Sequence, residues 1–146
     1  MADAASTLPD RFTLDLISPE ARLISRPVWQ VVCPGVEGEF GVRAGHMPLL
    51  SALKNGVVVV QDAPHAPAEI IFVAGGFADV TPAQLTLLAE EAVPVSSLQI
   101  EALNTAVDAL HAQINVAEND IAAAPLRKAL GVIQAKQASL ALVKTA

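Results

Sequence analysis

The chain has 146 residues and is poor in cysteine and aromatic side chains, with one cysteine, one tryptophan, no tyrosine and an aromatic content of 3%. Because Cys33 stands alone, neither an intrachain disulfide nor a cluster of thiolate metal ligands can form. Cys33 follows two valines, a setting that favours a small buried side chain over a reactive thiol. The sequence therefore excludes disulfide-stabilised and cysteine–metal folds.

Long apolar runs are missing too, although 53% of the residues are hydrophobic. The longest uninterrupted stretches fall well short of the roughly 20 residues that a membrane-spanning helix needs. Residues 1–10 carry two acidic side chains and lack the basic and apolar regions of a secretory signal, and we expect them to be flexible. We therefore expect a protein without a membrane span that stays in the compartment where it is made.

Positive charge is scarce. The nine lysines and arginines are dispersed, and the formal net charge is −6 at pH 7. Binding to a nucleic-acid backbone needs clustered cations, so nucleic acid is not an expected partner. The three histidines lie far apart and show no metal-ligand spacing, so no metal site is expected.

Catalytic signatures are also missing. No serine stands in a Gly-x-Ser-x-Gly motif, and the adjacent acids Glu90 and Glu91 would point to opposite faces of a strand. The glycines at positions 35, 38, 41 and 45 lack the Lys-Ser or Lys-Thr of a phosphate-binding loop, and we interpret them as turn residues. A binding or mechanical role is therefore favoured over an enzyme, with no cofactor.

The first part of the chain contains many short strand patterns. Phe12, Leu14 and Leu16 alternate with polar residues, as in a half-buried strand. The expected strands are residues 12–16, 21–25, 28–33, 39–42, 57–60, 69–74, 77–80 and 85–89, with an interruption at Arg26-Pro27 and a turn at Pro34-Gly35. Short strands separated by glycine and proline predict an antiparallel β-sandwich over residues 1–94.

The pattern becomes helical near Ser96, which has the spacing of a capping box with Gln99. Apolar residues then recur at intervals of four and three, as on one helix face: Leu103, Val107, Leu110, Ile114, Ala117 and Ile121. Because proline is costly inside a helix, we place a turn between Asn119 and Pro125. A second helix is expected over residues 126–143, with its apolar side chains at Leu126, Leu130, Ile133 and Leu140.

Residues 95–146 are thus expected to form an antiparallel two-helix hairpin, which makes the fold class α+β. The seam that holds the helices together is expected to consist of Leu103, Val107, Leu110, Ile114, Leu130 and Ile133. This seam is narrow, and Gly131 costs roughly 1 kcal/mol in a helix interior. We therefore expect a helical arm of modest stability.

The stretch from Gly38 to Leu53 is too irregular to be explained by core packing alone. Its glycines allow the positive φ angles of sharp turns, so residues 44–48 would form an exposed, firmly held loop, which is typical of a contact surface. His46 could either contact a partner or bond to the backbone to hold this loop, and Glu39 could either contact a partner or remain solvated. Turn positions are expected for Gly38, Gly41, Gly45, Gly75 and Gly76.

Two motifs resemble one known family. The first is Gly-Glu-Phe-Gly-Val at residues 38–42 followed by Gly-His-Met-Pro-Leu-Leu at 45–50. The second is Gly-Gly-Phe-Ala-Asp-Val at 75–80 followed by Leu-Thr-Leu-Leu-Ala-Glu-Glu-Ala at 85–92. Together they resemble the epsilon subunit of bacterial F-type ATP synthase, the counterpart of mitochondrial delta. Their order and spacing agree with that family from Phe12 onward.

This resemblance implies a non-catalytic subunit of the central stalk, or rotor. Such a subunit would bind the gamma subunit and the c-ring of Fo, and would couple proton translocation to ATP synthesis. It would be peripheral, on the cytoplasmic face of the bacterial inner membrane. The residues that match the family's signature loop, and would therefore contact the c-ring and gamma, are Glu39, His46, Met47, Pro48 and Leu49.

The helical half departs from some relatives, which bind ATP through an Ile/Leu-Asp-x-x-Arg-Ala motif. This chain reads Asn-Asp-Ile-Ala-Ala-Ala-Pro at residues 119–125, and no Arg-Ala pair follows. The cations of the second helix are Arg127, Lys128, Lys136 and Lys144. We therefore expect no ATP binding, and only weak regulation through contacts of the hairpin with the alpha and beta subunits.

Composition and periodicity also allow a free-standing adaptor, in which a β-sandwich with a helical arm scaffolds another complex. The two matching motifs distinguish these hypotheses, because an unrelated adaptor has no reason to share both.

Overall fold

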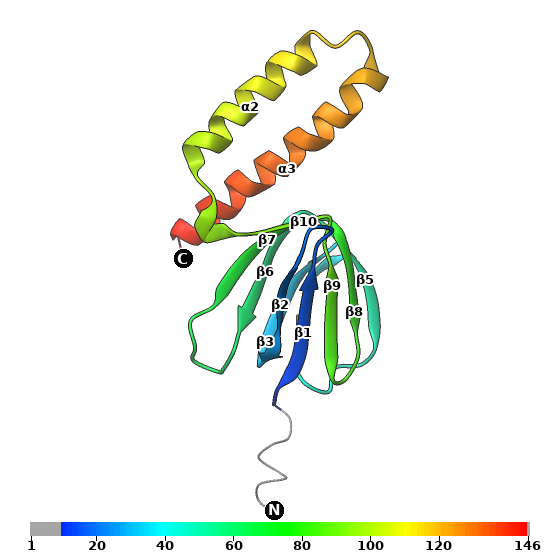
Figure 1. Cartoon of the computed structure of the whole chain (residues 1–146), viewed down its shortest axis with the longest axis vertical. Coiled ribbons are helices and arrows are strands. Elements are labelled where there is room, and N and C mark those ends of the chain that lie inside the picture. The colour runs from blue at the N-terminus through cyan, green and yellow to red at the C-terminus, as the bar shows by residue number, and fades with distance from the viewer. Residues whose placement is uncertain (1–9, 146) are drawn as a thin grey trace, which may run out of the picture. The chain divides into compact units, whose positions relative to one another are not determined.

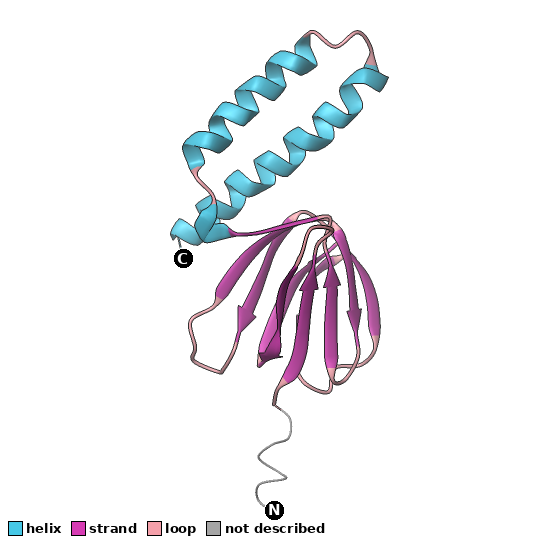
Figure 2. Ribbon diagram, viewed as in Figure 1, coloured by secondary structure: helices cyan, strands magenta, loops and turns pink. Residues whose placement is uncertain are grey.

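The computed structural model describes residues 10–145, with side chains up to Val143. The flexibility expected for residues 1–10 is not tested, because of these only Asp10 belongs to the described residues. The side chain of Lys144 also lies outside the described part. The chain divides into two compact units, and the boundary in the sequence falls between Pro94 and Val95. All strands fall in the first unit and all helices in the second (Figure 2).

The first unit contains ten strands. Their bounds are β1 (Phe12–Ile17), β2 (Arg22–Val28), β3 (Gln30–Gly35), β4 (Gly38–Val42), β5 (Leu49–Leu53), β6 (Gly56–Gln61), β7 (Glu69–Ala74), β8 (Gly76–Val80), β9 (Gln84–Leu88) and β10 (Glu91–Pro94). The order in the sheet is β10-β7-β6-β3-β5-β8-β9-β1-β2, and β4 pairs only with β3. Figure 1 shows β1, β9, β8 and β5 side by side. The described pairings are antiparallel except that of β1 with β9, which is parallel.

The core confirms the alternating pattern of the first strand. Phe12, Leu14 and Leu16 are buried, whereas Thr13 is exposed and Asp15 half-buried. Side chains from the other strands join the same core, among them Val28, Val31, Val42, Val58, Ile71, Val80, Leu85 and Leu87. Burying one such side chain stabilises a fold by about 1.5–3 kcal/mol, so this shared core is the main source of stability of the first unit.

The interruption predicted at Arg26-Pro27 is wrong, because β2 continues through both residues. β2 stands at one end of the sheet and pairs with β1 alone. On such an edge strand the missing N–H of proline can face outward without removing a sheet bond. The side chain of Arg26 then pairs with Asp62 at 3.1 Å and with Glu69 at 2.8 Å.

The turn predicted at Pro34-Gly35 is also wrong, since both residues belong to β3 and the turn lies at Val36-Glu37. The carbonyl of Pro34 accepts a bond from the Lys54 amide at 2.9 Å, which anchors this end of β3. Two strands, β5 and β10, were not predicted. β5 follows directly after the irregular loop, and β10 contains only four residues ending in a proline, so neither shows a clear alternation.

The second unit consists of a short 3₁₀ turn, η1 (Val95–Ser97), and two helices, α2 (Ile100–Asn115) and α3 (Asp120–Thr145). The helices pack side by side as an antiparallel hairpin, as expected (Figure 1). The predicted capping box is wrong. The chain makes the 3₁₀ turn first, so α2 begins at Ile100 with Gln99 as its N-cap, and the Gln99 side chain does not cap it.

The predicted position of the hairpin turn is wrong as well. The side-chain oxygen of Asn119 accepts a bond from the Ala122 amide at 2.8 Å, and its backbone carbonyl accepts one from Ala123 at 3.1 Å. Asparagine is a favoured N-cap, so α3 starts at Asp120 and runs through Pro125. The carbonyl of Ile121 loses its helical partner at Pro125, and because both residues are exposed, water can take the place of that partner.

The helical seam is shallow. Of the predicted seam residues only Leu103 is buried, and the others are half-buried: Val107, Leu110, Ile114, Leu130 and Ile133. Ile121 lies outside the seam with 86% of its surface exposed, because it belongs to the second helix. A hydrogen bond of 2.8 Å from Gln137 to Asn104 adds a polar link between the helices. Helix pairs with so little buried surface depend strongly on the intrinsic stability of each helix.

We expect Pro125→Ala to stabilise the hairpin, because it restores an N–H donor in the interior of α3; the gain is up to about 3 kcal/mol. Gly131→Ala is a matched control, since Gly131 is helical with no neighbouring atom within 4 Å of an added Cβ. That change should gain about 1 kcal/mol. Thermal unfolding followed by helical circular dichroism measures both. A gain for Pro125→Ala no larger than for Gly131→Ala would contradict a continuous α3.

Cys33 is fully buried in β3, and burial raises the pKa of its thiol from 9.0 to about 12. As pH rises, the unfolded chain loses the thiol proton first. The thiol's contribution to stability is therefore complete below pH 9.0 and is lost as the pH approaches 12. Over this pH range we expect the free energy of unfolding of the wild-type chain to fall further than that of Cys33→Ala. The difference between the two falls is at most roughly 4 kcal/mol. Urea titrations followed by Trp29 fluorescence measure the difference, and parallel curves would contradict it.

Candidate functional site

The loop between β4 and β5, residues 43–48, is held by backbone hydrogen bonds within itself and to the turn between β8 and β9. The Gly45 amide donates to the Pro82 carbonyl at 2.8 Å, and the His46 amide donates to the Arg43 carbonyl at 3.1 Å. His46 Nδ1 lies 2.7 Å from the Met47 carbonyl, so the half-buried ring also bonds to this backbone. The loop is therefore a shaped surface.

A cation–π contact supports one end of the loop. The Arg43 guanidinium lies 4.1 Å from the centre of the Trp29 ring. Such a contact contributes about 0.5–1 kcal/mol at an exposed site. It fixes the start of the loop against the connection between β2 and β3.

The structure separates the five predicted contact residues. Glu39 at the start of β4 and Leu49 at the start of β5 line one hollow of about 500 Å³. His46, Met47 and Pro48 lie in the loop outside it, and Met47 is 77% exposed. The other residues of the hollow are Val36, Glu37, Gly38, Phe40, Leu50, Ser51 and Ala52.

The predicted turn glycines differ in their roles. Gly38, Gly45, Gly75 and Gly76 have positive φ angles. Gly41, expected at a turn, instead lies within β4 opposite Val32 and has no positive φ. Gly76 is the most constrained, because its φ is +118° and an added Cβ would lie 2.0 Å from the Leu88 carbonyl oxygen.

A row of apolar side chains crosses the outer face of four neighbouring strands; we call it the apolar row. Ala52 of β5 stands opposite Phe77 of β8, Phe77 opposite Leu88 of β9, and Leu88 opposite Ile17 of β1. Phe77 is 60% and Leu88 51% exposed. Large apolar side chains gathered in this way on a surface mark interaction sites.

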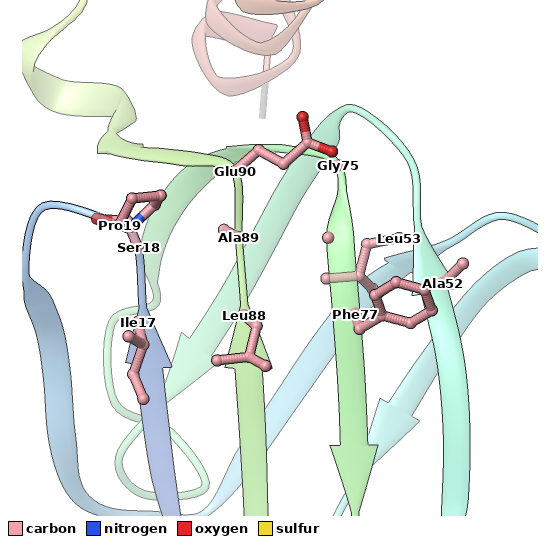
Figure 3. A pocket seen from close by; sticks show the side chains of 11 residues that line it. Ile17, Ser18, Pro19, Ala52, Leu53, Gly75, Phe77, Leu88, Ala89 and Glu90 are labelled. Carbon is pink, nitrogen blue, oxygen red and sulfur yellow. The ribbon is translucent and has the colours of Figure 1, made fainter.

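The apolar row borders a hollow of about 580 Å³ (Figure 3). Figure 3 shows Ile17, Leu88 and Phe77 on adjacent strands, with Glu90 and Gly75 at the end of the hollow where the strands turn. Its other lining residues are Ser18, Pro19, Ala52, Leu53, Gly76 and Ala89. The walls are largely apolar, so the hollow suits an apolar side chain of a partner.

Acidic side chains lie beside the apolar row. In the next cross-strand row Leu50 pairs with Asp79, Asp79 with Thr86, and Thr86 with Asp15. The Asp15 carboxylate accepts a 2.7 Å bond from Gln84 through one oxygen, whereas its other oxygen is buried without a partner. Glu90 lies on the other side of the apolar row. This surface therefore favours a partner that carries hydrogen-bond donors or cations next to apolar residues.

The helical hairpin offers another exposed surface near its turn, where Val116 is 80% and Ile121 86% exposed. Of its cations, Arg127 pairs with Asp120 at 3.4 Å. Within residues 10–145, no group of three His, Cys, Asp or Glu side chains could hold a metal ion. Nor is any described helix long and apolar enough to cross a membrane.

Sequence reasoning missed the apolar row. The available signal was that Phe77 occupies the same phase of its strand as Asp79, whereas Ala78 and Val80 point inward. Leu88 likewise follows the buried Leu87 directly and therefore faces outward. An aromatic or large aliphatic residue in the polar phase of a strand indicates a contact surface, but only the register shows that these residues are neighbours.

A β-sandwich followed by a helical hairpin is the architecture of a known class of stalk proteins. The family described as the beta-sandwich domain of the ATP synthase delta/epsilon chain matches residues 11–95. The ATP synthase epsilon chain of Parvibaculum lavamentivorans is 43% identical over 113 residues, which cover 77% of this chain and 85% of that protein. The epsilon chain of Rhodospirillum centenum is 38% identical over 133 residues, covering 88% and 91%.

Solved structures show the same fold. A chain of the Euglena gracilis mitochondrial ATP synthase, from an assembly of OSCP, F1 and c-ring, superposes with a TM-score of 0.77 at 24% identity. The superposition covers 92% of this chain and 84% of that one. The chain therefore belongs to the ATP synthase delta/epsilon family, as an epsilon subunit.

We expect Gly76→Ala to destabilise the first unit by at least about 2 kcal/mol, because it combines a positive φ with a backbone clash directly beside Phe77 of the apolar row. Gly41→Ala is the control, since nothing lies within 4 Å of an added Cβ there. That change should alter the free energy of unfolding by less than about 1 kcal/mol. Urea unfolding measures both, and equal effects would contradict the special role of Gly76.

Proposed function

We propose that this chain is a non-catalytic rotor subunit of an F1Fo ATP synthase, which binds gamma and the c-ring and couples proton translocation to ATP synthesis. It acts as a peripheral protein on the cytoplasmic face of the bacterial inner membrane. The observation that carries the proposal is the apolar row on a chain whose family consists of ATP synthase subunits. A monomer gains nothing from exposing Phe77 and Leu88 side by side, whereas a stalk subunit needs such a surface.

The apolar row is assigned to gamma. Burying Phe77 and Leu88 against a partner removes apolar surface from water, and central aromatic side chains contribute much of the binding energy of protein interfaces. The acidic neighbours Asp15, Asp79 and Glu90 then orient the partner more than they strengthen binding.

The signature loop and the strand beside it are assigned to the c-ring and gamma. Glu39 offers a carboxylate, while Met47, Pro48 and Leu49 offer exposed apolar surface. Because the backbone bonds of the loop are made within the chain, the loop meets its partner with little loss of conformational entropy. A rotor subunit must transmit torque, and a preformed loop is suited to that role.

The hairpin is assigned at most a weak regulatory contact with the alpha and beta subunits. Its exposed residues Val116 and Ile121 supply apolar surface, but Arg127 is already engaged with Asp120. This arrangement and the missing Arg-Ala motif argue against a site for ATP.

To test the proposal, the ATP synthase is purified from membranes with the wild-type chain or with Phe77→Asp. We expect Phe77→Asp to fold normally, because the side chain is 60% exposed, but to reduce recovery in the complex at least tenfold by placing a charge in the interface. His65→Asp adds the same charge in the exposed loop between β6 and β7, and should assemble normally.

The same preparations separate coupling from assembly. Glu39→Arg and His46→Trp should lower the ratio of proton pumping to ATP hydrolysis in membrane vesicles. If the wild-type chain is absent from the purified complex, the proposal fails and the adaptor hypothesis replaces it. Normal recovery of Phe77→Asp would exclude the apolar row as the gamma contact.

A further inference from the structure

We infer that the free edge of β4 takes up an extended segment of a stalk partner as an additional strand. The segment would carry apolar and basic side chains. This inference rests on the proposed function, because the segment belongs to a partner in the ATP synthase stalk. It goes further by naming the strand edge that is used and the chemistry of the segment.

The backbone of β4 has an unpaired side. Pro34 pairs with Glu39, and Val32 with Gly41. The Pro34 carbonyl bonds to Lys54, and Val32 pairs on its other side with Val59 of β6. In an antiparallel pair, when one residue directs its backbone groups away from the partner strand, the opposite residue does too. The N–H and C=O groups of Glu39 and Gly41 therefore point to the free edge of β4.

The turn geometry gives the same orientation. Gly35 and Gly38 close the two-residue turn at Val36-Glu37. Residues that close a two-residue hairpin turn are the hydrogen-bonded pair, and bonded and non-bonded pairs alternate along the strands. Glu39 and Gly41 fall at non-bonded positions. Apart from the pairing of β4 with β3, no described residue makes a backbone–backbone hydrogen bond to Glu39 or Gly41.

The two strands at the ends of the described strand order, β2 and β10, are protected, and β4 is not. The edge strand β2 contains Pro27 and has Arg26 tied to two carboxylates, and the four-residue β10 ends at Pro94. Proline and basic side chains block strand addition. β4 reads Gly-Glu-Phe-Gly-Val and contains neither. An unprotected sheet edge is a site for strand addition.

The hollow beside β4 defines the chemistry of the added segment. It has a volume of about 500 Å³ and exposes the apolar residues Val36 (54%) and Leu50 (74%). Its only charged residues are Glu37 and Glu39, both exposed. Alternate side chains of an added strand point to the same face, so apolar residues can enter the hollow while a lysine or arginine meets these carboxylates.

Two substitutions at Gly41 test this mode of binding. Gly41→Pro removes the N–H that faces the free edge and no bond to β3, whereas Gly41→Ala keeps that N–H. The probe is purified F1Fo complex stripped of this subunit. We expect Gly41→Pro to bind about 5- to 30-fold more weakly than wild type, because the change removes one hydrogen bond and leaves the acceptor of the partner without its donor. Gly41→Ala should stay within about threefold, because less than 1 kcal/mol separates such affinities.

A second measurement needs no variant. Hydrogen exchange of the wild-type peptide 38–43, followed by mass spectrometry, should slow at least tenfold when the chain binds the stripped complex. Normal binding with unchanged exchange, or a folded Gly41→Pro that binds as wild type, would overturn the strand-addition inference alone. If the wild-type chain fails to bind the stripped complex, the proposed function fails and this inference fails with it.

Discussion

The parallel pairing of β1 with β9 is the constraint on which the rest of the first unit depends. It joins the first strand of the sheet to the ninth, and its register places Leu14 beside Leu85 and Leu16 beside Leu87 in the core. Because side chains alternate with a period of two, the same register places Ile17 beside Leu88 on the outer face. A shift of this register by one residue would bury the apolar row and expose the core side chains of β1 and β9. The apolar row and the core are thus consequences of one pairing.

The two units are stabilised in different ways. The sandwich draws residues from many strands into one core, in which several side chains, such as Leu14, Val31 and Leu87, are completely buried. The hairpin has a shallow seam and a proline within α3. Cooperative burial makes the first unit a rigid platform, whereas the second relies on local helix stability. This division agrees with the proposed function, in which the first unit makes the main contacts and the hairpin at most a weak one.

The two proposed contacts of the sandwich differ in kind, one through side chains and one through the backbone. The apolar row offers side chains on the face of the sheet, and the edge of β4 offers backbone groups next to acidic residues. Face contacts draw their energy mainly from apolar burial, and edge contacts from main-chain hydrogen bonds. The proposed function requires two partners, which these two surfaces would distinguish by different physical means.

The sequence by itself determined the α+β class, most strands, the helical hairpin and the family, because periodicity and turn residues are local signals. It misplaced the helix turn at Pro125, since the cap made by Asn119 outweighed the proline, and it ended β2 too early because edge positions are not visible in a sequence. It singled out Glu39 and Leu49 as contact candidates but could not show that they share a hollow, nor that Phe77, Leu88 and Ile17 form a row. Those arrangements join residues that are distant in the chain, and only the register of paired strands, fixed by burial of a common core, decides them.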